Sequence, residues 1–283
     1  MLVLQLSVVA LLVLVIILFG NAFYQATKLP DNTPSKYLRQ QIKSDGSKKV
    51  VVLMGDSVTH GRIGVNYVDM VEDQLDGAQF EIINAGINSE LAWNNLQRVD
   101  EVIQCDPDIV TVLIGTNDAN ATLSPDSMRS YVRRMKLPRE PDSGWYRESL
   151  SSLVKKLKTE TNAQIALLSI PTIGEEANHP AFLKSSEYSS IVHNIAEETN
   201  VTYLPLHEKM IEFLRDTPGS PTYSYEKSFI GMFKAIFSRY LLRKSWDKIA
   251  YNSGFSLHVD HIHLNTAGAR IIADLIGVFI QSV

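Results

Sequence analysis

The sequence predicts an α/β fold in which helices cover both faces of a five-stranded parallel sheet, preceded by one apolar helix. Two observations indicate it. From residue 49 onward, short β-branched runs alternate with longer stretches of helical periodicity, whereas the first twenty residues are almost all apolar. With 283 residues, of which 45% are hydrophobic, the chain can bury one large core, so we expect one folded domain.

The first element is the apolar segment from Leu2 to Gly20, which has only Gln5 and Ser7 as polar residues and no charge. It is long enough to span a bilayer as a helix, so residues 1–22 are predicted to form an uncleaved single-pass membrane anchor. A cleaved signal peptide is the alternative, although a basic start is missing. Basic residues follow the span and none precedes it, which favours a cytoplasmic domain, but large domains can be exported regardless of such charge. The side of the membrane stays open.

The next segment, residues 23–47, is polar and interrupted by proline and serine, which is typical of a tether. The folded domain is then predicted over residues 48–283. Its five expected strands are Val50–Met54, Phe80–Asn84, Asp108–Ile114, Gln164–Ile170 and Val201–Pro205. Its expected helices are Gly64–Leu75, Glu90–Gln104, Tyr146–Thr161, Ser185–Thr199, Leu206–Arg215 and Thr266–Ile280.

Polar and small residues follow three of these strands, where the loops of a parallel sheet form binding sites. Ser57 follows the first strand in Gly55-Asp56-Ser57, ahead of a helix, and is a candidate nucleophile. Gly86 follows the second strand and could present its backbone N–H to a ligand. Asn117 follows the third strand in Gly115-Thr116-Asn117-Asp118, and its amide could donate to an oxyanion. Taken singly, each is equally well explained as a cap or a turn.

The sequence Asp260-His261-Ile262-His263 lies just before the last helix. A serine hydroxyl needs a base to take its proton, and a carboxylate that accepts from the base's other ring nitrogen holds the base in one tautomer. Asp260 and His263 are three residues apart, so one turn of chain can bring them together. Alternatively, Asp260 caps the final helix and His263 packs in the core.

In this order the four motifs resemble those of the SGNH hydrolase superfamily, also called GDSL esterases and lipases, from about Val50 onward. The resemblance implies a three-layer α/β/α flavodoxin-like sandwich and a serine hydrolase. It implies Ser57, Asp260 and His263 as the catalytic triad, with the N–H groups of Ser57 and Gly86 and the Asn117 amide as the oxyanion hole. Two departures concern the substrate subclass: Val58 follows the serine, and the second motif reads GINSEL where a second glycine is common.

The implied reaction is hydrolysis of a small-molecule or lipid carboxylic ester through an acyl-enzyme on Ser57, without a cofactor. A carbohydrate O-deacetylase of the same fold is an alternative. From another class, His258, Asp260, His261 and His263 could bind a divalent metal, or the fold could serve as a non-catalytic binding module. The sequence does not indicate an oligomeric state.

Charge and cysteine content exclude other classes. The net charge of −4, with spread basic residues, argues against nucleic acid as a partner. Cys105, the single cysteine, excludes an intramolecular disulfide.

Residues 223–255 carry apolar residues at near-helical spacing together with six basic ones. This segment is predicted to be core, or else a lid or an interfacial helix that favours long-acyl substrates, in which case Phe233→Ser and Phe237→Ser would impair long-chain hydrolysis most.

Overall fold

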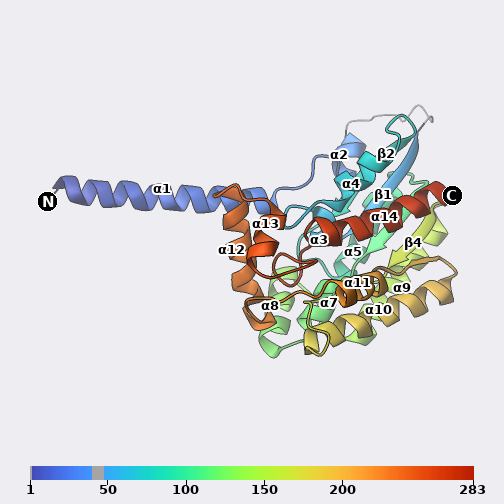
Figure 1. Cartoon of the computed structure of the whole chain (residues 1–283). Coiled ribbons are helices and arrows are strands. Elements are labelled where there is room, and N and C mark those ends of the chain that lie inside the picture. The colour runs from blue at the N-terminus through green and yellow to red at the C-terminus, as the bar shows by residue number, and fades with distance from the viewer. Residues whose placement is uncertain (1, 40–47) are drawn as a thin grey trace.

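The computed structural model describes residues 2–39 and 48–283, and within this part the side chains of residues 2–12 are not described. Five strands form one sheet in the order β2-β1-β3-β4-β5, and every neighbouring pair is parallel. Figure 1 shows this sheet between two layers of helices. The strands are β1 (Lys49–Gly55), β2 (Phe80–Gly86), β3 (Ile109–Leu113), β4 (Gln164–Leu168) and β5 (Thr202–Leu204). The predicted α/β sheet is therefore confirmed.

Alternate residues of the central strands point to opposite faces, since side chains alternate along a strand. Val50 and Val52 of β1 belong to a core shared with helical residues between 92 and 196. Val51 and Leu53 belong to a second core on the other face, shared with helical residues at 67–71, 206–214 and 269–280. Burial on both faces explains why these strands are continuous apolar runs rather than alternating patterns.

Helices occur in each predicted region. Those that pack on the sheet are α4 (Tyr67–Gln74), α5 (Ala92–Gln97), α6 (Val99–Ile103), α9 (Ser143–Glu160), α10 (Pro180–Thr199), α11 (Leu206–Asp216) and α14 (Thr266–Ser282). The expected single helix over residues 90–104 is two helices, because the chain turns at Arg98, whose guanidinium bonds to Glu90 and to the Ala85 carbonyl. Helices for which no range was predicted are α2 (Pro34–Arg39), α3 (Ser57–His60), α7 (Thr116–Ala121), α8 (Pro125–Met135), η1 (Tyr225–Lys227) and α13 (Trp246–Asn252).

A third, smaller core lies beside the sheet, where α1 (Leu2–Thr27) meets α12 (Ser228–Tyr240). Ala22 and Ala26 of α1 are buried in this cluster, and the ring centroids of Phe19 and Phe237 lie 4.0 Å apart. Figure 1 shows α1 projecting from the domain, with its last turns beside α12 and α13. Within residues 223–255, Ile236 of α12 is core, whereas Phe229 is 67% exposed.

The structure contradicts the prediction of a transmembrane helix. Among the helices whose side chains the structure describes, none is both long enough and apolar enough to cross a bilayer. Ala22 and Ala26, near the end of α1, pack on the domain. The prediction of a single-pass anchor at the membrane is therefore wrong for this part of the chain. The side chains of residues 2–12 of the predicted span lie outside the description, as do residues 40–47 of the predicted tether.

Candidate active site

The turn from β1 into α3 presents Ser57. Gly55 is required there, because a Cβ at this position would lie 2.2 Å from Thr59 Oγ1 and 2.5 Å from the Leu113 carbonyl oxygen. Asp56 caps α3, with its Oδ1 accepting from the Val58 N–H at 3.0 Å. Ser57 is the first residue of the helix, so its own N–H has no acceptor within the helix and remains available to a ligand.

The structure brings Ser57, His263 and Asp260 into one hydrogen-bonded series. The Ser57 Oγ lies 3.0 Å from His263 Nε2, and His263 Nδ1 lies 2.8 Å from Asp260 Oδ2. The other carboxylate oxygen, Asp260 Oδ1, accepts from the backbone N–H groups of Ile262 at 3.1 Å and His263 at 2.8 Å. Because its Nδ1 faces a carboxylate, His263 donates there and presents Nε2 to the serine as an acceptor.

The electrostatics of the pair favour a charged imidazole. Burial alone lowers the pKa of His263, but the Asp260 carboxylate outweighs it, so the pKa lies above its ordinary value. Burial alone raises the pKa of Asp260, but His263 and the two backbone donors outweigh it, so that pKa is lowered. A group placed in this way can accept a proton from a hydroxyl while its partner remains an anion.

Asn117 lies in the first turn of α7 with its amide already occupied by protein groups. Its Nδ2 donates to Asp56 Oδ2 at 3.2 Å and to the Glu90 carbonyl at 3.0 Å, and its Oδ1 accepts from the Tyr131 hydroxyl at 2.7 Å. Burial raises the pKa of the Asp56 carboxyl to about 7. Sequence reasoning missed Tyr131, which lies on α8, a helix that was not predicted.

Gly86 ends β2, and its N–H donates to the Asn84 side-chain oxygen at 2.9 Å. A Cβ on Gly86 would lie 2.2 Å from the His60 backbone nitrogen, so this glycine allows β2 and α3 to approach closely. Three residues on, Ser89 has a φ of +66°, and its N–H makes no hydrogen bond with the described residues. Ser89 lies in the second motif, GINSEL, and its left-handed backbone was not predicted from the sequence.

The histidines around the site point in different directions. His258 contacts Glu175 and the Thr172 carbonyl, and the Nε2 of His261 contacts the Tyr223 carbonyl at 2.9 Å. Within the described chain, no group of three or more histidine, cysteine or carboxylate side chains is placed to hold a metal ion. The alternative of a metal centre therefore finds no converging ligands in this loop.

Comparison with known protein families identifies the family of this chain. The model of the GDSL-like lipase/acylhydrolase family matches residues 53–271, which is most of the chain and includes all five candidate residues. The chain belongs to this family. The resemblance to SGNH hydrolases is thereby confirmed, and membership of the GDSL-like family supports ester hydrolysis as the reaction.

Solved structures similar to this GDSL-like protein include acetylxylan esterases. Axe2 from Geobacillus stearothermophilus is 22% identical, with a TM-score of 0.58 over 82% of this chain and 93% of that chain. The acetyl xylan esterase AlAXEase is 20% identical, with a TM-score of 0.59 over 82% of this chain and 99% of that chain. At such identities the likeness shows the fold alone. No curated protein sequence matches this one.

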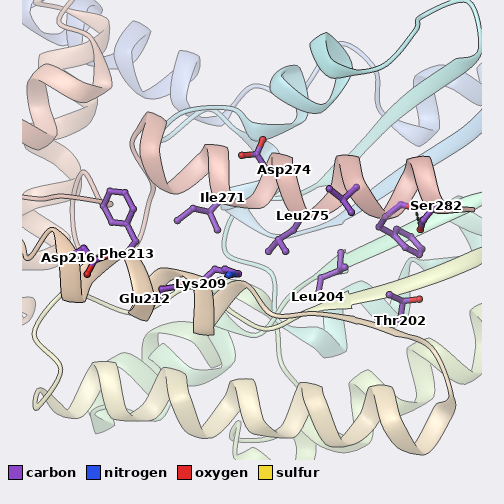
Figure 2. Close-up of a pocket in the computed structure, with 12 residues that line it drawn as sticks. Thr202, Leu204, Lys209, Glu212, Phe213, Asp216, Ile271, Asp274, Leu275 and Ser282 are labelled. Carbon is purple, nitrogen blue, oxygen red and sulfur yellow. Dashed lines mark hydrogen bonds and ion pairs between the residues drawn. The ribbon is translucent and has the colours of Figure 1, made fainter.

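The GDSL-like domain also has an open groove away from the candidate residues. The groove has a volume of about 640 Å³ and lies between α11 and α14, beside β5. Figure 2 shows Phe213 of α11 and Leu275 of α14 among the side chains that line it. None of the five candidate residues lines this groove, so it does not belong to the candidate active site.

Proposed function

We propose that this protein is a serine esterase in which Ser57 is the nucleophile, His263 the general base and Asp260 the group that orients the base. The observation that carries the proposal is the series of two contacts, 3.0 Å from Ser57 Oγ to His263 Nε2 and 2.8 Å from His263 Nδ1 to Asp260 Oδ2. This is the arrangement that converts a weakly acidic hydroxyl into a nucleophile for acyl transfer.

The reaction would proceed in two balanced steps. His263 takes the Ser57 proton as Oγ attacks the ester carbonyl, and then returns it to the departing alcohol, which leaves an acyl-enzyme. A water molecule gives its proton to His263, attacks the acyl carbon and releases the carboxylic acid, and the proton returns to Ser57. The chain's own groups supply the nucleophile, the base and the oxyanion donors.

The oxyanion hole of the proposal consists of the Ser57 N–H, the Gly86 N–H and the Asn117 amide. The Ser57 N–H is free of an intrahelical acceptor, whereas Gly86 and Asn117 currently donate to Asn84, Asp56 and Glu90. A developing negative charge on the substrate would compete with these acceptors, and each donor so engaged contributes about 3 kcal/mol to transition-state stabilisation in acyl-transfer enzymes.

A carbohydrate ester is the second candidate substrate, and a specific observation favours it. The similar structures are described as acetylxylan esterases, and those of Axe2 described as catalytic mutants replace a serine, an aspartate and a histidine, of which the aspartate precedes the histidine by three residues. Asp260 and His263 have the same spacing. We therefore infer that removal of an acetyl group from a sugar hydroxyl is the reaction to test beside that of simple and lipid esters.

The test uses the full-length protein with p-nitrophenyl esters from acetyl to palmitoyl and with acetylated xylo-oligosaccharides, measuring p-nitrophenol and acetate. Ser57→Ala and His263→Ala should abolish hydrolysis and labelling by a fluorophosphonate probe. Ser152→Ala, on the exposed face of α9, is the matched control and should behave as wild type. Folded wild-type protein that hydrolyses none of these esters and takes no label would refute the proposal, and the ratio of acetate release to palmitate hydrolysis distinguishes the substrate classes.

A further inference from the structure

A single buried carboxylate fastens the loop that carries Asp260 and His263. Glu175 lies in the connection between β4 and α10, and its side chain is fully buried. Its Oε1 accepts from the N–H groups of Leu257 at 2.7 Å and His258 at 2.9 Å, and its Oε2 accepts from the Ser256 N–H at 2.9 Å. Consecutive backbone donors of one loop thus converge on one side chain of another.

The His258 side chain completes this attachment. Its Nδ1 lies 3.0 Å from Glu175 Oε1, and its Nε2 lies 2.8 Å from the Thr172 carbonyl oxygen. A carboxylate and a carbonyl are both acceptors, so both ring nitrogens of His258 face oxygen atoms that can accept a hydrogen bond. Burial alone raises the pKa of Glu175, but His258 and the backbone donors outweigh it, so that pKa is lowered. The two loops are therefore joined by a buried, hydrogen-bonded contact between Glu175 and His258.

The attachment lies two residues before Asp260 and continues to the base. The Val259 N–H donates to the His263 carbonyl at 2.8 Å, and His258 forms an antiparallel bridge with Leu264, so residues 256–264 fold back on themselves. At the tip of this loop, the Gly174 N–H donates to the carbonyl of His261 at 2.7 Å. Glu175 and Gly174 thus hold the beginning and the tip of the loop that carries His263.

We propose that Glu175 is a positioning residue, which fixes residues 256–264 through their backbone N–H groups and His258 and so keeps His263 Nε2 within hydrogen-bond distance of Ser57 Oγ. This inference rests on the proposed function, because it concerns the placement of its base. Small displacements at such a site are costly: a misplacement of about 1 Å can lower the rate about a hundredfold.

The first test is Glu175→Gln, which preserves volume and an acceptor oxygen but removes the charge that pairs with His258. We expect kcat, counted per probe-labelled serine, to fall by about tenfold or more while KM changes less than about twofold. The acid limb of the pH profile should move to lower pH, because His263 loses part of its contact with Asp260. Glu176→Gln is the matched control, since Glu176 is exposed and its side chain makes no hydrogen bond within the described residues.

A second readout does not depend on activity. Hydrogen exchange of residues 256–264 should accelerate in Glu175→Gln and in His258→Gln, while exchange in the β1 and β3 cores stays as in wild type. Unchanged kcat, acid limb and loop exchange in a folded Glu175→Gln protein would overturn the inference. A wild-type protein inert on every ester would refute the proposed function, whereas faster loop exchange would still establish the attachment made by Glu175.

Discussion

The Tyr131 hydroxyl donates to Asn117 Oδ1 at 2.7 Å and thereby fixes which way the Asn117 amide faces. Because the oxygen is held by Tyr131, the amino group must point toward Asp56 and the Glu90 carbonyl. Tyr131 itself accepts from Asn120, whose oxygen accepts from the Tyr225 hydroxyl. A hydrogen-bonded series therefore runs from Tyr225 at the start of η1 to the candidate oxyanion donor.

Tyr131→Phe should lower kcat of ester hydrolysis by about fivefold, which corresponds to the loss of about 1 kcal/mol from one neutral hydrogen bond. The physical reason is that Asn117 would no longer be held in one orientation. Steady-state kinetics on p-nitrophenyl acetate check this, with Tyr251→Phe on the exposed surface of α13 as the control. An unchanged kcat would show that Asp56 and Glu90 orient the amide without Tyr131.

The pH dependence of kcat/KM should have an acid limb above pH 6.5. His263 must be neutral to accept the serine proton, so activity is lost as pH falls through its pKa, and Asp260 raises that pKa above the ordinary 6.5. Asp260→Asn should move the limb to lower pH and reduce kcat by about 10⁴-fold. If the acid limb stays at the same pH in Asp260→Asn, a group other than His263 is responsible for it.

Gly86→Ala separates the proposed role of the Gly86 N–H as an oxyanion donor from the packing role of the missing Cβ. Alanine keeps the backbone N–H but adds a Cβ. That carbon would lie 2.2 Å from the His60 nitrogen and 2.5 Å from the Thr59 carbonyl carbon, both of which are backbone atoms of the helix that carries Ser57. We expect a loss of about 1–3 kcal/mol in the free energy of unfolding together with a lower kcat. Gly77→Ala is the control, because a Cβ added at Gly77 would have no described atom within 4 Å. Wild-type stability in Gly86→Ala would contradict the close approach.

Asp118→Asn should stabilise the protein increasingly as the pH rises above about 4. Burial raises the pKa of the Asp118 carboxyl from 3.8 to about 8 in the folded state, so its protonated form favours folding fully below about pH 4 and this contribution is lost as pH rises toward 8. Asparagine mimics the protonated acid and still accepts from the Ala92 N–H, which Asp118 holds at 3.1 Å. Thermal melts from pH 4 to 9 should show the variant gaining on wild type as pH rises, whereas exposed Asp73→Asn should not.

The periodicity of the sequence predicted the sheet well. All five strands lie within a few residues of their expected positions, because strands buried on both faces are short apolar runs that pattern alone reveals. The short helices α3 and α7 were not predicted, since helices of four to six residues have too few turns to show a period.

The surroundings of the candidate site were less accessible to sequence reasoning. The roles of Ser57, Gly86, Asn117, Asp260 and His263 remain predictions. Glu175 and His258 are 83 residues apart, and nothing in either local sequence indicates that they meet. The membrane prediction relied on the apolar run from Leu2 to Gly20, whereas among the residues whose side chains the structure describes no helix is long and apolar enough to cross a membrane.

The distance along the chain between Ser57 and His263, 206 residues, has a consequence for biosynthesis. The proposed nucleophile, Ser57, emerges from the ribosome soon after the first strand, but the proposed base, His263, follows only after the fifth strand and α13. A nascent chain can therefore contain all five strands and still lack the proposed base. Under the proposed roles, the contact between Ser57 and His263 can form only after residues 256–264 have been synthesised.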